Sequence, residues 1–169
     1  MDREERDNVR QIVHWYRERD ALSLIALRYL PSLLALSLAW EIAHLPLYTL
    51  WSEGEPAFIA FSVAHCTLGD VVIGIAALLL ALIVTRSAAP THWRWGLIAS
   101  FAALASIGYT AFSEWMNTAV LRSWSYSDLM PTVGIMGVEI GVSPLLQWLV
   151  IPPLALRFAR GYCRGTQAG

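Results

Sequence analysis

The residues of this chain that are best suited to chemistry are ionisable side chains inside long apolar stretches. Glu41 and His44 form a Glu-x-x-His pair, His65 and Asp70 lie in the next apolar stretch, and Glu114 lies in the third. A charge at mid-bilayer costs about 2.5–3.5 kcal/mol on insertion scales, so such residues usually face the interior of a helical bundle and mark a functional site. Carboxylates and imidazoles in that position are suited to proton transfer or to metal binding.

Four of the polar residues come out at nearly the same depth when residues are counted along a helix at about 1.5 Å each. Glu41, His65 and Glu114 are roughly 11–14 Å from the nearer ends of their apolar stretches. Gln147, in the fourth stretch, reaches a similar level. Four helices thus offer one polar residue each to a common layer, and we predict that these residues converge.

Helical spacing adds neighbours to this layer. His44 and Asn117 each share a face with the acid three residues before them. His65 and Asp70 are five residues apart, about 140° around a helix, so they cannot both point at one centre. We therefore expect His65 in the layer and Asp70 beside it as a flanking group.

Two kinds of chemistry fit this cluster, and the first is metal binding. One divalent ion, Zn or Fe, would be held by Glu41, His44, His65 and Glu114, because carboxylates and imidazoles hold such ions in helical bundles. The chain has one Glu-x-x-His where two-metal bundles have two, so a two-metal site is not indicated.

The second is acid–base catalysis on a small lipophilic molecule that enters from the bilayer. Buried carboxylates and imidazoles can exchange protons near neutral pH, which suits an isoprenoid, a sterol or a quinone. Glu41, His65 and Glu114 are the candidate catalytic residues. The candidate binding residues are His44, Asp70, Asn117, Gln147, Trp124 and Tyr126.

Two short segments are loosely similar to the emopamil-binding isomerase group. They are His44-Leu45-Pro46-Leu47 and the stretch from Trp148 to Pro152. The small helical bundles of that group also place carboxylates and a histidine in a membrane cavity, so the resemblance implies the same kind of site here.

Other interpretations remain open. The polar groups can satisfy one another, Glu41 with His65 and Glu114 with Asn117 or Gln147, at about 0.6–2 kcal/mol a bond. The alternative function is then a metal- or cofactor-handling protein or an accessory subunit of a larger membrane complex, in which the cluster is structural. A polar seam of Ser106, Thr110, Glu114 and Asn117 suits ion transport less well, because few polar residues continue it across the other half of the bilayer.

The elements that position these residues are predicted to be four membrane helices. The apolar stretches are 29–50, 58–84, 95–121 and 142–158, and each is close to the 20 or so residues that cross a hydrocarbon core. The predicted fold is all-α, a four-transmembrane-helix antiparallel bundle with an N-terminal interfacial amphipathic helix. Its parts are residues 1–28, 29–160 and a tail of 161–169; Val9, Ile12, Val13 and Tyr16 form the apolar side of the N-terminal helix.

Composition agrees with a membrane protein. The chain is 56% hydrophobic and 15% charged, with a net charge of -1. A soluble domain carries about 25% charged residues. The absence of a basic cluster on a folded domain also argues against a nucleic-acid partner. The expected partners are the lipid bilayer and a lipophilic small molecule, and self-association into an oligomer is compatible with the sequence.

Arginine sets the expected orientation. All twelve basic residues of the Lys and Arg type are arginine, and eleven of them lie before the first stretch, between the second and third, or at and beyond the end of the fourth. Positive charge collects on the cytoplasmic side. We predict a multi-pass protein of a bacterial inner membrane with both termini cytoplasmic and the polar layer in the extracytoplasmic half.

The connection of residues 122–141 is the long one, at about twenty residues. Long loops in compact domains often act as lids or binding elements. Trp124 and Tyr126 are either part of such a lid or aromatic anchors at the membrane interface.

Cysteine-accessibility mapping tests this topology. A cysteine introduced at Ser52 is expected to react with a membrane-impermeant reagent added from the extracytoplasmic side. Labelling from the cytoplasmic side only would overturn the orientation.

Overall fold

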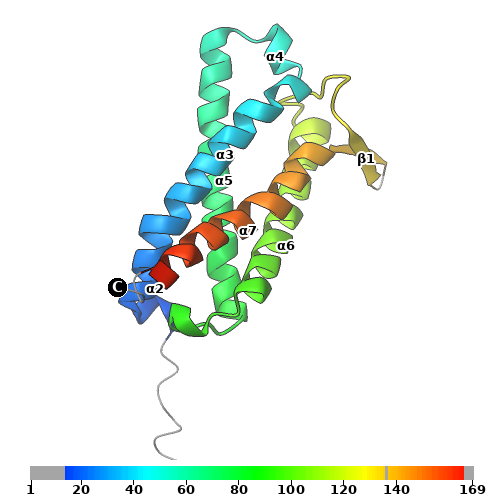
Figure 1. Cartoon of the computed structure of the whole chain (residues 1–169). Coiled ribbons are helices and arrows are strands. Elements are labelled where there is room, and N and C mark those ends of the chain that lie inside the picture. Colours follow the sequence, from blue (N-terminus) through cyan, green and yellow to red (C-terminus); the bar gives the residue numbers. More distant parts are fainter. Residues whose placement is uncertain (1–13, 136, 166–169) are drawn as a thin grey trace, which may run out of the picture.

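The computed structural model describes residues 14–135 and 137–165, which form four long helical rods and one short hairpin (Figure 1). The helical elements are η1 (Trp15–Arg17), α2 (Arg19–Leu24), η2 (Ile25–Tyr29), α3 (Leu30–His44), η3 (Leu45–Leu47), α4 (Leu50–Glu53), α5 (Pro56–Val84), η4 (Pro90–His92), α6 (Trp95–Trp115), η5 (Met116–Val120) and α7 (Val142–Gly165). The strands are β1 (Thr132–Ile135) and β2 (Val138–Gly141).

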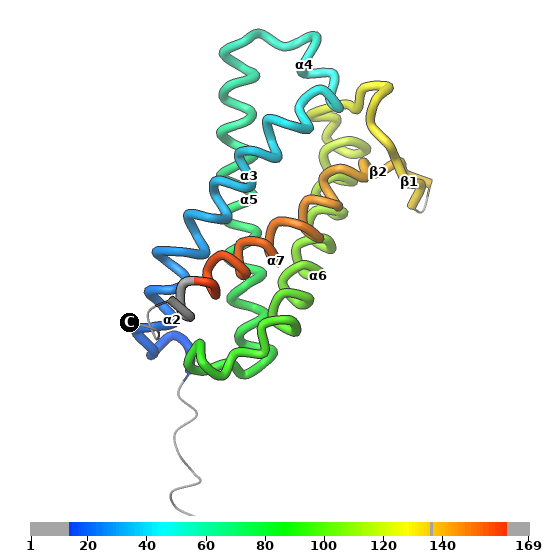
Figure 2. The backbone as a smooth tube through the Cα atoms, in the orientation of Figure 1, coloured from blue at the N-terminus to red at the C-terminus, as the bar shows by residue number. Residues whose placement is uncertain are grey.

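The four rods form an antiparallel bundle. Each packs against two neighbours, in the ring order α3, α5, α6, α7 and back to α3. The chain reverses direction between successive rods, so that all four neighbouring pairs run antiparallel (Figure 2). We call the end with α2 and η4 the terminal end, and the end with α4 and the β1–β2 hairpin the hairpin end.

Four helices are long and apolar enough to cross a membrane: Arg19–Leu47, Pro56–Val84, Trp95–Val120 and Val142–Gly161. This confirms the predicted all-α class and the four spans of a multi-pass membrane protein. The first rod starts at Arg19, not near residue 29, because Ala21, Leu24 and Ile25 continue the buried face by a further two turns. Residues 1–13 lie outside the described part of the chain, so the N-terminal interfacial helix stays a prediction.

The β1–β2 hairpin was not predicted. It pairs Ile135 with Val138 and Thr132 with Gly141, inside what the sequence indicated only as a long loop. Gly137 has a φ of +84°, which glycine adopts without the strain that a Cβ would bring. All of β1 is exposed, and Figure 2 shows the hairpin projecting from the side of the bundle where β2 leads into α7.

The surface of the bundle is apolar and part of its interior is polar. On α3, Leu38 and Ile42 are 41% and 59% exposed, whereas Ser37, Glu41 and His44 are buried. Exposed apolar residues and buried polar ones are expected of a helix whose outer face meets lipid, because a polar group in hydrocarbon has no hydrogen-bond partner.

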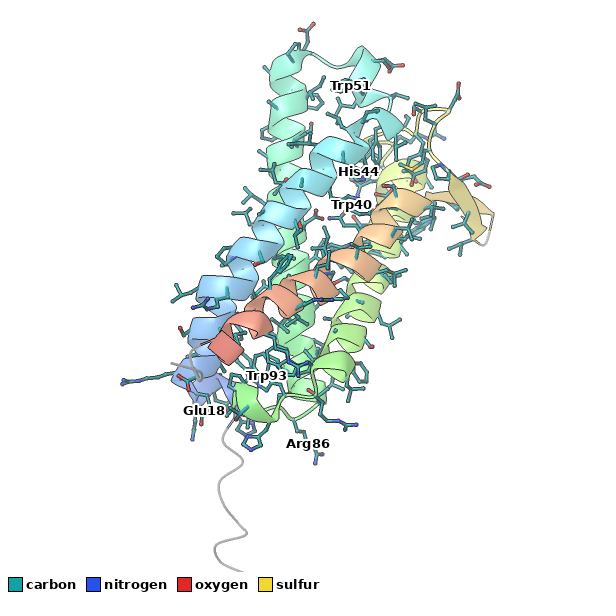
Figure 3. The ribbon with its side chains drawn as sticks, in the orientation of Figure 1. Glu18, Trp40, His44, Trp51, Arg86 and Trp93 are labelled. Carbon is teal, nitrogen blue, oxygen red and sulfur yellow. The ribbon has the colours of Figure 1, made fainter. Side chains whose placement is uncertain are left out.

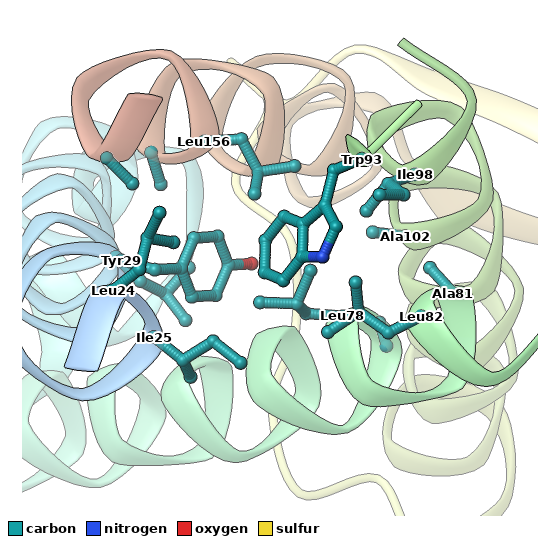
Figure 4. Packing of buried hydrophobic residues seen from close by; sticks show 14 of the residues in the cluster. Leu24, Ile25, Tyr29, Leu78, Ala81, Leu82, Trp93, Ile98, Ala102 and Leu156 are labelled. Carbon is teal, nitrogen blue, oxygen red and sulfur yellow. The ribbon is translucent and has the colours of Figure 1, made fainter. Parts of the chain in front are cut away.

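The hydrophobic core lies at the terminal end. Its centre is formed by the rings of Tyr29 and Trp93, surrounded by Leu78, Leu82 and Leu156 (Figure 4). Trp93 donates its indole N–H to the carbonyl of Ala88 at 2.8 Å. Small residues recur along the helices of this core, which lets the helices approach closely. They are Ala77, Ala81, Ala102, Ala155 and Ala159.

The first rod and α5 come into close contact at Gly74. The Tyr29 hydroxyl donates to the carbonyl of Gly74 at 3.2 Å. A Cβ placed on Gly74 would lie 2.7 Å from Cδ2 of Leu33, a side chain that is fully buried and has no open space to move into. Glycine, whose side chain is a single hydrogen atom, therefore lets the first two rods come this close at position 74.

Replacing Gly74 by valine should separate these rods. We expect Gly74→Val to lower the free energy of unfolding by about 1–3 kcal/mol, the usual cost of overpacking a core. The matched control is Gly108→Val, because a Cβ on Gly108 meets no atom within 4 Å. Unfolding followed by circular dichroism in mild detergent measures both. Equal stability of the two variants would contradict this packing.

Candidate functional site

A cavity of about 850 Å³ lies between the four rods at the hairpin end. It is bounded by the second half of α3, the first half of α5, the end of α6, the start of α7 and the connection at 122–125. Figure 3 shows the labelled His44 at this end, on the side of α3 that faces α7, far from Trp93 in the core. The molecule is thus tightly packed at one end and hollow at the other.

Two helical seams carry the acids of this cavity. On α3, Ser37 and Glu41 are four residues apart and both buried. On α6, Ser106, Thr110 and Glu114 repeat at the same interval and are also buried, as the sequence predicted for the polar seam. A repeat of four keeps side chains on one helix face, so each seam rises from the packed end of the bundle to an acid in the cavity wall.

Glu41 and His44 form the pair expected from their spacing. The distance from Glu41 Oε1 to His44 Nε2 is 3.3 Å. The other imidazole nitrogen, Nδ1, lies 3.1 Å from the hydroxyl of Ser143 in the first turn of α7. His44 therefore links the first rod to the fourth, and both of its ring nitrogens are engaged.

Asp70 has a more central place than the sequence predicted. Its carboxylate accepts a hydrogen bond from the side-chain amide of Gln147 on α7. It also lies close enough to Glu41 for the two carboxyl groups to interact. The expectation that Asp70 only flanks the layer was wrong, because Asp70 bonds Gln147 and interacts with Glu41 in the wall of the cavity.

Glu114 is held by a tyrosine from the long connection. The Tyr126 hydroxyl donates to Glu114 Oε2 and accepts from the backbone N–H of Gly141 at 2.9 Å. Burial, together with the hydrogen bond to Glu114, raises the pKa of Tyr126 well above its ordinary value. The phenol therefore stays protonated at any physiological pH and remains a donor to Glu114.

The backbone holds Tyr126 in this place. The N–H of Thr49 donates to Ser125 at 3.1 Å, and the N–H of Ser127 donates to Leu47 at 2.9 Å. Between these bonds Tyr48 and Tyr126 form a β-bridge, with ring centroids 5.7 Å apart. We call residues 45–49 and 123–127 the collar, because the two segments pair beside the cavity at the hairpin end.

His65 lines the cavity but takes no part in the acid cluster. It is exposed, and its ring stacks on Phe61 at a centroid distance of 5.7 Å. His65 and Asp70 point in different directions, as their spacing of five residues predicted. The structure turns Asp70 inward and His65 to the cavity mouth, the reverse of the predicted arrangement.

Asn117 and Trp124 also line the cavity. The Asn117 amide donates to the carbonyl of Ser113 at 2.9 Å, within its own helix. The Trp124 indole N–H approaches Glu114 without hydrogen-bond geometry, and it is buried with no partner among the described residues. A ligand oxygen in the cavity can accept from it.

The donor set does not fit the proposed metal ion. Among the described residues, no three His, Cys, Asp or Glu side chains are close enough to hold one ion. Glu41 and His44 are paired with each other, Glu114 is bound by Tyr126, and His65 lies apart at the mouth. The expected set of Glu41, His44, His65 and Glu114 is therefore not assembled as a metal site.

Several residues of the site were missed by the sequence reasoning. Ser143, Tyr48 and the phenylalanines of α5 carry no motif, and only the fold brings them to the cavity. No family model, curated protein or solved structure matches this chain. The site must be interpreted from its own geometry.

Removing the Tyr126 hydroxyl tests the geometry of Glu114. Tyr126→Phe leaves the Glu114 carboxylate and the Gly141 N–H without a partner, so we expect the free energy of unfolding to fall by about 1.5–3 kcal/mol, as for hydrogen bonds to charged groups. Tyr109→Phe is the matched control, since Tyr109 is 55% exposed on α6 and has no comparable bond. Thermal unfolding in detergent measures both, and equal midpoints would show that Tyr126 does not hold Glu114.

Proposed function

We propose that this protein is a membrane-embedded enzyme that moves a proton on a small lipophilic molecule by acid–base catalysis. One observation carries the proposal: Glu41, Asp70 and Glu114, from three different helices, line a single cavity of about 850 Å³ between the helices of an apolar bundle. Bridging helices alone would need only Ser, Thr or Asn, whose burial costs less.

The acids fall into two groups with different hydrogen bonding. Glu114 accepts a hydrogen bond from the Tyr126 hydroxyl, which orients its carboxyl group, and we assign it the role of the base. Asp70 and Glu41 lie close enough for their carboxyl groups to interact, and we assign this pair the role of the acid.

These groups can shift a double bond without a redox partner. The Glu114 carboxylate takes a proton from a carbon of the substrate as that C–H bond breaks. The Asp70–Glu41 pair delivers a proton to another carbon, where a C–H bond forms. The substrate leaves with its formula unchanged, and proton exchange within the site restores both groups.

The surroundings support a lipophilic substrate. Leu45, Val63 and Ile73 line the same cavity as the acids, so an apolar body can be held while its reactive carbon reaches them. We further propose that the protein lies in a bacterial inner membrane with both termini cytoplasmic, which the arginine distribution favours. The hairpin end and the cavity would then lie toward the extracytoplasmic side.

Deuterium incorporation tests the proposed reaction. The purified protein is placed in nanodiscs made from the total lipid extract of its host membrane, transferred to D₂O, and the lipids are examined by mass spectrometry. We expect one lipophilic compound to gain deuterium at carbon. General acid–base groups contribute about 10²–10⁴-fold to rate, so Glu114→Gln and Asp70→Asn should slow incorporation by at least about 100-fold.

The matched control is Glu139→Gln, which neutralises an exposed acid on β2 outside the cavity. This variant should exchange deuterium at the wild-type rate. The proposal fails if the wild type incorporates no deuterium. It also fails if Glu114→Gln, shown to be folded by its thermal midpoint, incorporates deuterium as fast as the wild type.

A further inference from the structure

Three rings follow one another along one face of α5. The ring centroids of Phe58 and Phe61 are 6.3 Å apart with an interplanar angle of 25°, and those of Phe61 and His65 are 5.7 Å apart at 21°. The spacing of three and then four residues keeps them in line on the helix. We call Phe58, Phe61 and His65 the ring ladder.

The ring ladder belongs to the cavity wall and to its mouth. All three residues line the cavity. Phe58 and Phe61 are nevertheless 56% and 62% exposed, and His65 is exposed as well. The ladder runs from the start of α5, at the hairpin end, toward the turn that carries Asp70. A molecule that enters along α5 from the bilayer would meet these rings before it meets the acids.

The last ring of the ladder has unused hydrogen-bonding capacity. No described residue hydrogen-bonds the imidazole of His65, whereas both ring nitrogens of His44 are engaged. A neutral imidazole has one donor and one acceptor nitrogen. His65 can therefore bond an oxygen substituent on a group that is stacked against the ladder.

From these observations we infer that the cavity selects a lipophile with a flat unsaturated ring that bears an oxygen substituent. Stacked aromatic pairs gain more than their buried area alone, and a saturated ring cannot present a π-face to them. A straight alkyl chain would need neither the row of parallel rings nor the free imidazole. This inference rests on the proposed function, for which it names the class of substrate.

Equilibrium binding of two probes tests the inference. The first is a 1,4-naphthoquinone with a decyl chain, and the second is decylcyclohexanone, which keeps the chain and a ring oxygen but is saturated. Binding is measured by dialysis against nanodiscs that contain the protein, with empty nanodiscs as the blank for lipid partitioning. We expect the wild type to prefer the quinone by about 2–12-fold, the affinity equivalent of one aromatic pair.

Three variants separate the contribution of the aromatic rings to probe binding from that of the imidazole nitrogens. Phe61→Leu keeps apolar volume but removes the ring, so the preference for the quinone should fall to about one. Phe112→Leu is the matched control, because Phe112 is 53% exposed on α6 and does not line the cavity, and the preference should persist. His65→Phe keeps a stacking ring and removes the nitrogens, so both probes should weaken by about 2–12-fold while the preference remains.

The outcomes separate this inference from the proposed function. Equal binding of both probes to the wild type, or a preference that survives in Phe61→Leu, would overturn the role of the ring ladder. Unchanged binding in His65→Phe would overturn the role of the imidazole. Neither result affects the deuterium experiment, in which slower incorporation by Glu114→Gln is the evidence for acid–base catalysis. Failure of both probes to bind above the blank would overturn the inference of a ring-binding cavity.

Discussion

The structure depends on the different residues that face inward at the two ends of one bundle. At the terminal end, glycine and alanine let the rods meet directly, as at Gly74, where no Cβ fits beside Leu33. At the hairpin end, glutamate, histidine, aspartate and glutamine occupy the same inward-facing positions. These side chains are larger and need partners, because a buried unpaired polar group costs about 1–3 kcal/mol in proteins. The cavity lies among these side chains.

The polar residues of the cavity are connected across the bundle. His44 bonds Ser143, Asp70 accepts from Gln147, and Glu114 accepts from Tyr126. Each bond joins an acid or its partner on one rod to α7 or to the connection before it. The collar closes the same end through backbone hydrogen bonds. These bonds thus join the walls of the cavity to one another.

The sequence predicted the parts of the site that follow from helical periodicity. The Glu41–His44 pair and the buried seam that leads to Glu114 depend only on spacing within one helix, and both are present. The rotation of α5 could not be predicted. Of His65 and Asp70, the structure turns Asp70 inward, because the two phenylalanines before His65 share its face and lie at the cavity mouth.

The contacts made by the segments that connect the helices could not be predicted from the sequence. Tyr126 was a candidate binding residue, but its bond to Glu114 depends on a β-bridge to Tyr48. A bridge between segments far apart in the chain produces no periodic pattern in the sequence, so it could not be predicted. The hairpin had a weak local signal, since Gly137 stands between two short runs of strand-forming residues, 132–135 and 138–141. The Gln147–Asp70 bond shows a further limit: depth counted from Cα positions ignores the reach of a long side chain.

The central claim is that Glu41, Asp70 and Glu114 surround a space that a lipophilic molecule occupies. An experimental structure determined in nanodiscs of native lipid tests it most directly. The account predicts elongated density between α5 and α6 at the hairpin end, with one end near Glu114 and Asp70. A bundle that is closed at this end, with the three carboxyl groups bonded only to protein groups and no space between them, would contradict it.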